Sequence, residues 1–150
     1  MRTMNYNGDV GFMRPLVELW AQEANGDEFG IKIDTNVVLH NMQELANMPS
    51  ATLMLLLNED IVVGFMGIFL HNSPVSVGLS ANENFWYVLP KHRGASSLRL
   101  LKAAKKWAKD AGALHITMSA SKLASDQHDK VCKIYEKDMK HFETTYIMEL

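Results

Sequence analysis

The segment between Trp86 and Gly112 places an apolar run that ends on a proline, a short basic loop and a long amphipathic helix in direct succession. Because Pro90 lacks an N–H group and cannot continue a central hydrogen-bond ladder, the strand expected over 84–89 ends there. Apolar residues then recur at the i, i+3 and i+4 spacing of a helix over 96–111, with Gly112 as a C-terminal cap. A strand over 114–118 follows. This strand–helix–strand unit predicts two parallel strands joined by a right-handed connection.

The rest of the chain predicts a mixed sheet with helices on both faces. Two apolar runs, 53–57 and 61–70, flank Asn58-Glu59-Asp60, which is the pattern of an antiparallel hairpin. Gly64 and Gly67 in the second run indicate a bulge or a close approach by another backbone. The further elements expected are a strand over 2–6, a helix over 10–24, a helix capped by Asp34 or Thr35 and ended by Pro49, a helix over 131–139 and a final strand over 142–150.

Length and composition indicate one α/β domain over residues 1–150. Hydrophobic residues make up 47% and charged residues 21%, which is an ordinary globular composition. The formal net charge of -2 argues against a dedicated nucleic-acid binder. No apolar run is long enough to span a bilayer and the first residues lack a signal-peptide pattern, so we expect no membrane partner and a cytoplasmic location. The one cysteine, Cys132, fits a reducing compartment.

The loop before the long helix has the properties of an anion site. Gly94, Ala95 and Ser96 are small and leave backbone N–H groups accessible, and the helix that follows adds unpaired donors and the positive end of its dipole. Lys91 and Arg93 add charge. The same features fit an ordinary turn that leads into a solvated basic helix. Neither a Walker GxxxxGK[ST] loop nor a dinucleotide GxGxxG is present.

Two motifs resemble those of a known family. Val88-Leu89-Pro90-Lys91-His92-Arg93-Gly94-Ala95-Ser96, followed by the amphipathic helix, resembles the acyl-CoA-binding motif of the GNAT acetyltransferase superfamily. Ile134-Tyr135-Glu136-Lys137 resembles the family's "L-Y-E-K" helix. Asp138-Met139 stands where the family usually has Gly-Phe, and His128 where it often has asparagine. The expected order of elements also matches, so the resemblance extends over nearly the whole chain.

The resemblance implies a GNAT-like fold with a single-domain, mostly antiparallel sheet of six to seven strands, in which two central parallel strands splay apart. The co-substrate it implies is acetyl-CoA, with its pantetheine arm between strands 84–89 and 114–118 and with Lys91 or Arg99 near its adenosine-side phosphate. It implies dimers as a common assembly, so a homodimer is one expectation. The cofactor-binding residues expected are Val88, Leu89, Lys91, Arg93, Gly94, Ala95, Ser96, Ser97 and His128.

Transfer to an amine needs a base that deprotonates the ammonium and a donor that assists the departing thiolate. The resemblance suggests Tyr135 as the acid; helical spacing alone also fits a packing tyrosine. Glu83, at the start of the central strand, and His71, at the end of the hairpin, are candidate bases, and His115 is a third. The polar sequence around Glu83 also fits an ordinary carboxylate on the protein surface. The histidines form no HxxxH or HExxH pair, so no metal is expected.

Three functions compete at this point. The first is an acyl-CoA-dependent N-acyltransferase that acetylates a primary amine of a small molecule, peptide or protein by direct transfer in a ternary complex. The second keeps the fold without catalysis, as an acyl-CoA- or protein-binding module. The third, a nucleic-acid binder that uses the basic helix, ranks last because of the net charge. An acetyl-cysteine route through Cys132 would need a base beside it, and the sequence places none, so we expect that thiol to be packed.

Overall fold

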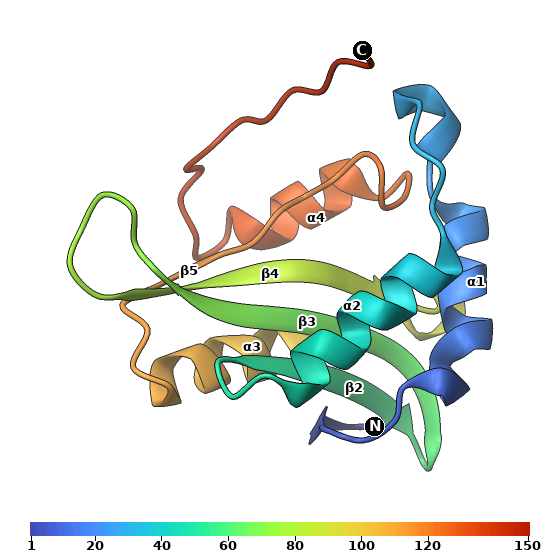
Figure 1. The fold of residues 1–150 in the computed structure, drawn as a ribbon, viewed down its shortest axis with the longest axis horizontal. Coiled ribbons are helices and arrows are strands. Elements are labelled where there is room, and N and C mark those ends of the chain that lie inside the picture. Colours follow the sequence, from blue (N-terminus) through green and yellow to red (C-terminus); the bar gives the residue numbers. More distant parts are fainter.

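In a computed structural model, which describes residues 1–150, a sheet runs through the middle of the molecule with helices on both sides (Figure 1). Its five strands lie in chain order: β1 (Arg2–Tyr6), β2 (Ala51–Asn58), β3 (Ile61–Asn72), β4 (Leu79–Val88) and β5 (His115–Thr117). The helices are α1 (Arg14–Glu23), α2 (Thr35–Asn47), α3 (Ser97–Asp110) and α4 (His128–Tyr135). Short 3-10 turns occupy Gly11–Met13, Gly26–Phe29 and Pro90–His92. No helix is both long enough and apolar enough to cross a bilayer.

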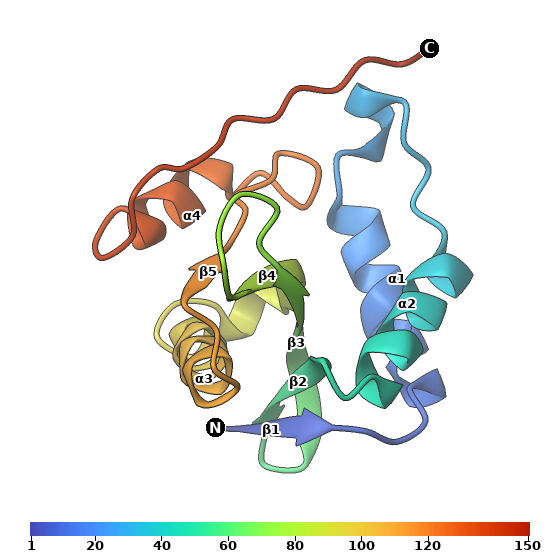
Figure 2. The ribbon, with the colours of Figure 1, turned by 60° about the vertical axis from the view of Figure 1, so that its left-hand side comes forward.

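The two faces of the sheet carry separate cores, which explains the continuous apolar run of β2. Successive strand residues point to opposite faces. Leu53, Leu55 and Leu57 are therefore buried with α1 and α2, whereas Met54 and Leu56 are buried with α3. Figure 2 shows α3 on one side of the sheet and α1 with α2 on the other. The expectation of helices on both faces is confirmed.

The hairpin forms where the sequence predicts it. β2 and β3 are antiparallel, and the two-residue turn between them contains Glu59 with a positive φ of 56°. Both glycines of β3 allow close approaches: a Cβ on Gly64 would lie 2.8 Å from the carbonyl oxygen of Tyr87, and one on Gly67 would lie 2.6 Å from a Leu45 methyl group. The register of the β2–β3 pair also shifts next to Gly64, as expected of a bulge.

Helix α2 starts with the predicted cap. The Asp34 carboxylate accepts hydrogen bonds from the N–H groups of Asn36, at 2.8 Å, and Val37, at 3.2 Å. Helix α1 begins later than expected, because Gly11–Met13 forms a 3-10 turn ahead of it. Helix α4 begins at His128, three residues before the expected start, and ends at Tyr135 in a turn.

The expected strand over 84–89 is longer than predicted, because β4 starts at Leu79. The polar stretch Ser80–Asn84 has no apolar alternation, yet Ser80–Glu83 is paired with β3 on one side and Ser80–Asn82 with β5 on the other. Hydrogen bonding from both neighbours therefore fixes a strand that side-chain pattern could not reveal. The pairing of β4 with β5 is parallel, as predicted.

The prediction of a final strand over 142–150 is wrong, and so is the expected sheet of six to seven strands. From Lys140 onward no main-chain group takes part in a main-chain hydrogen bond. Phe142, Tyr146 and Met148 are 80%, 90% and 79% exposed. Figure 1 shows the segment leaving the sheet, and Glu149 near its end lies against Gly30. The apolar alternation is present, but no strand lies beside this segment, and a strand cannot form without a partner.

Candidate functional site

The centre of the candidate site is the point where β4 and β5 part. They pair only from Ser80–His115 to Asn82–Thr117, and β5 ends there while β4 continues to Val88. Directly after the last pair, the register of β4 against β3 shifts between Glu83 and Phe85, so that Asn84 has no partner. Bulges bend and twist a strand and re-aim its side chains. The bulge accounts for the separation of β4 from β5 and leaves the β5 side of 83–88 without a partner strand.

Glu83 lies at this bulge. Its carboxylate accepts a hydrogen bond of 3.0 Å from the N–H of Ser119, just beyond β5. Burial raises the pKa of Glu83 from 4.5 to about 7, against the smaller lowering effect of the Ser119 hydrogen bond. A carboxyl group with this pKa exchanges protons near neutral pH, which is the property needed of a general base.

Tyr135 approaches the same point from α4. Its side chain is buried, its ring centroid lies 6.3 Å from that of Trp86, and its hydroxyl donates a long hydrogen bond of 3.5 Å to the carbonyl oxygen of Ser119. Burial raises the pKa of Tyr135, with further contributions from the charges of Glu83 and Cys132. The two side chains selected from sequence are thus held by the N–H and the C=O of one residue, Ser119.

Ser119 itself was not identified from sequence. It acts through its main chain, so its residue type carries no signal. Its position was the available clue. Ser119 follows a predicted parallel strand, so it lies at the same edge of the sheet as the residues that follow Asn82 in the neighbouring strand.

His71 lies apart from this pair. Its Nδ1 is 2.9 Å from the carbonyl oxygen of Asn72, and its Nε2 is bonded to the side chain of Asn82. Both ring nitrogens therefore have partners, which leaves neither free to accept a proton from an amine. His115 is exposed at the start of β5 and pairs with Ser80, at the far end of the β4–β5 ladder from Glu83. Of the three candidates, Glu83 alone shares a bonding partner with Tyr135.

The loop between β4 and α3 offers three free amides. Arg93 and Ser97 are among the expected cofactor-binding residues, but Arg93 N–H donates to Pro90 and Ser97 N–H donates to Gly94, so both groups are used within the loop. The N–H groups of Gly94, Ala95 and Ser96 donate to no protein acceptor. They lie at the start of the 14-residue helix α3, where the helix dipole adds positive potential. The arrangement fits a diphosphate, with exposed Lys91 and Arg99 nearby.

The side chain of Arg93 turns into the protein rather than toward this anion site. Its Nε donates to the carbonyl oxygen of Val88 at 2.8 Å, its guanidinium pairs with Glu23 at 2.6 Å, and it lies 5.6 Å from the ring centroid of Tyr87. Arg93 therefore holds the end of β4 against α1. The N–H of Leu89 is also used, because it donates to Val63.

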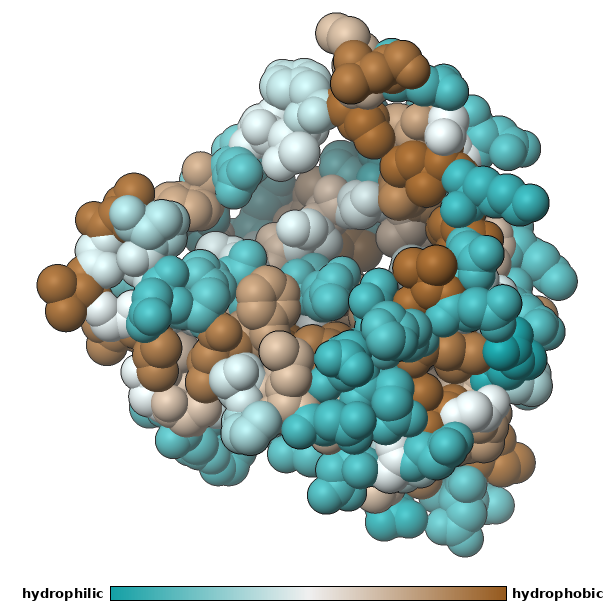
Figure 3. Space-filling view, in the orientation of Figure 1, coloured by the Kyte–Doolittle hydropathy of each residue, from teal (hydrophilic) through white to brown (hydrophobic).

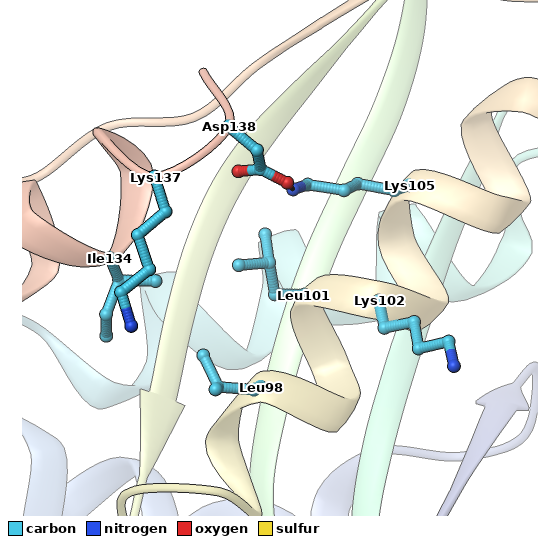
Figure 4. A pocket seen from close by; sticks show the side chains of 7 residues that line it. All are labelled: Leu98, Leu101, Lys102, Lys105, Ile134, Lys137 and Asp138. Carbon is cyan, nitrogen blue, oxygen red and sulfur yellow. Dashed lines mark hydrogen bonds and ion pairs between the residues drawn. The ribbon is translucent and has the colours of Figure 1, made fainter.

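A groove of about 340 Å³ lies between α3 and the end of α4 (Figure 4). Leu98, Leu101 and Ile134 give it an apolar lining, and lysines stand at its rim. Lys105 and Asp138 form an ion pair of 2.6 Å across it. The apolar lining and basic rim suit a ligand that joins an aromatic or aliphatic body to phosphates.

Two further features border the site. His128, expected among the cofactor-binding residues, is the first residue of α4; its Nδ1 is 2.9 Å from an Asp129 carboxylate oxygen and its Nε2 is 3.7 Å from the Cys132 sulfur. On the side of the molecule seen in Figure 3, the surface is hollowed below the C-terminal segment that Figure 1 shows in red.

No protein-family model and no curated protein matches the sequence. Among solved structures, the chain is similar to ribosomal-protein-alanine N-acetyltransferase from Brucella melitensis biovar Abortus 2308, with a TM-score of 0.74, 16% identity and coverage of 100% of both chains. It is similar to a GNAT family acetyltransferase from Staphylococcus aureus, with a TM-score of 0.65, 14% identity and 100% of both chains. It is also similar to a transcriptional regulator from Bacillus halodurans C-125, with a TM-score of 0.77, 15% identity and coverage of 99% of this chain and 100% of that one. The chain has the fold of the GNAT acetyltransferases.

Proposed function

We propose that this protein is an acyl-CoA-dependent N-acyltransferase that moves an acetyl group from acetyl-CoA to a primary amine of a small molecule, peptide or protein, by direct transfer in a ternary complex. The observation that carries the proposal is the meeting of Glu83 and Tyr135 at Ser119, where β4 and β5 separate. The free amides of Gly94, Ala95 and Ser96 support it at the other end of the same gap.

Glu83 serves as the base. An ammonium has no lone pair, so the acceptor must lose a proton before it attacks. With a pKa of about 7, Glu83 is ionised in a large fraction of molecules at neutral pH and still basic enough to take that proton, directly or through one water. The Ser119 N–H fixes one carboxylate oxygen and leaves the other free for the amine.

Tyr135 assists the leaving group. Its raised pKa keeps the hydroxyl protonated, so it is a hydrogen-bond donor across the working pH range. A thiol has an ordinary pKa of about 8.5, well below that of this hydroxyl. Tyr135 therefore stabilises the departing thiolate chiefly by a hydrogen bond, and complete proton transfer is not required. The hydroxyl is free to redirect because its bond to Ser119 is long.

The loop and the groove hold the co-substrate. Three unpaired amides at the start of α3 bind its diphosphate, and the apolar lining from Leu98 and Leu101 contacts the rest of the nucleotide or the pantetheine arm. Because the groove that takes the co-substrate lies beside α3, on one side of the sheet, the amine approaches from the other side, and both substrates are bound together.

The test combines binding with turnover. Acetyl-CoA should raise the melting temperature by mass action, and a panel of primary amines should reveal amine-dependent release of free thiol. The rate constant kcat/KM should rise with pH through about 7 and fall by about 100-fold or more in Glu83→Gln, as expected for loss of a general base. Glu18→Gln, an exposed carboxylate on α1, is the matched control. Binding without turnover on any amine would assign the fold to a binding module instead.

A further inference from the structure

Helix α4 carries two side chains, His128 and Cys132, that the proposed transfer reaction does not use. His128 and Cys132 are four residues apart and Tyr135 is three further on, so all three lie on one face of the helix. That face meets β4, because the Tyr135 ring packs near Trp86. Cys132 is half-buried there and forms no disulfide.

The hydrogen bonds of His128 orient it toward the thiol. Its Nδ1 is 2.9 Å from the Asp129 carboxylate, which can only accept, so Nδ1 carries the proton. The lone pair of a neutral imidazole then lies on Nε2, which is 3.7 Å from the Cys132 sulfur. A thiol, a base within hydrogen-bond reach and a carboxylate that fixes the tautomer of the base are the three parts of an activated nucleophile.

We propose that Cys132 is an activated thiol that accepts the acyl group of acyl-CoA when no amine occupies the site, so that the protein becomes S-acylated on this residue. The inference rests on the proposed function, because it needs acyl-CoA to bind beside Tyr135. It assigns to His128 the role of base toward Cys132 and to Asp129 the positioning of that base.

The step is a thiol–thioester exchange and needs no oxidant. The Cys132 proton passes to His128 Nε2 as the sulfur attacks the thioester carbonyl carbon. The bond between that carbon and the sulfur of CoA breaks, and the departing thiolate takes the proton from His128. One thioester is exchanged for another, so the reaction is close to neutral in free energy, and the S-acyl group remains reactive toward an amine that arrives later.

Its location makes the site accessible to the acyl group. Cys132 and Glu83 are both near enough to the Tyr135 hydroxyl for their charges to act on it. Cys132 lies one helical turn before Tyr135 on α4, and Tyr135 and Glu83 both bond to Ser119, just beyond the end of β5.

The experiment incubates the full chain with saturating acetyl-CoA and no amine and follows the intact mass over time. One added acetyl group is expected, it should map to Cys132, and hydroxylamine should remove it, which distinguishes a thioester from acetyl-lysine. Cys132→Ala should not be labelled. His128→Gln should be labelled at least about tenfold more slowly, and Asp129→Asn should be slowed to a smaller extent. His40→Gln, an exposed histidine on α2, is the matched control and should label at the wild-type rate.

Acetyl-CoA affinity, measured separately by calorimetry for each variant, separates the two claims. Binding with no label on Cys132, or with equal labelling rates in wild type and His128→Gln, overturns this inference and leaves the proposed function standing. Absence of acetyl-CoA binding overturns both.

Discussion

Replacing Glu83 by Gln tests the energetic basis of the site without any knowledge of the acceptor. Gln has nearly the same shape and can still accept the hydrogen bond from Ser119 N–H, but it cannot ionise. The substitution therefore removes the buried charge and little else.

The magnitude follows from the pKa of Glu83, which burial raises from 4.5 to about 7. Since one pKa unit corresponds to about 1.4 kcal/mol, ionising this buried carboxyl costs the folded state up to about 3 kcal/mol. The unfolded chain loses its proton near pH 4.5 and the folded chain near pH 7, so the stability of the wild type falls between these values. Below pH 4.5 the carboxyl is mostly protonated in both states, so the cost is small.

The assay is urea unfolding of wild type and Glu83→Gln at a series of pH values from 4 to 8. The two proteins should have similar free energies of unfolding at the acid end. As the pH rises toward 8, Glu83→Gln should become the more stable protein by about 2 to 3 kcal/mol. A constant difference across the series would show that Glu83 is solvated, and would remove the reason to regard it as a base tuned to neutral pH.

Three further outcomes are expected. Gly94→Glu should abolish acetyl-CoA binding in calorimetry, because it places a carboxylate among the free amides. Gly112 has a similar positive φ and equally open surroundings at the other end of α3, so Gly112→Glu is the control and should bind normally. Equal effects of the two substitutions would indicate a general loss of structure. Tyr135→Phe should lower kcat more than it weakens acetyl-CoA affinity, and unchanged turnover would remove its role. Deleting 140–150 should change the free energy of unfolding by less than about 1 kcal/mol, because the segment makes no main-chain hydrogen bond; a larger loss would show that it pairs as a strand.

The elements that sequence predicted correctly are those whose own residues determine them. The hairpin around Glu59, the Asp34 cap and the amphipathic helix α3 each carry their pattern locally. The first half of β4 does not, because its polar residues are held in a strand by β3 and β5. The C-terminal segment shows the opposite case, since 142–150 has the alternation of a strand and finds no partner.

The candidate site divides in the same way. Gly94 to Ser96 could be identified because small residues before a helix are visible in one stretch of sequence. The meeting of Glu83 with Tyr135 depends on the bulge at Asn84 and on the main chain of Ser119, neither of which has a residue-type signature. Arg93 turns inward because it pairs with Glu23, seventy residues away in the chain. The basic loop alone predicted that Arg93 adds charge to an anion site, whereas its side chain holds β4 to α1.

The central claim, that acyl-CoA binds with its diphosphate at the start of α3 and its thioester beside Tyr135, is tested most directly by an NMR titration of the ¹⁵N-labelled protein with acetyl-CoA. The amide signals of Gly94, Ala95 and Ser96 should shift the most, together with that of Ser119, while signals from β1 stay in place. Shifts confined to exposed lysines, with those four amides unchanged, would contradict it.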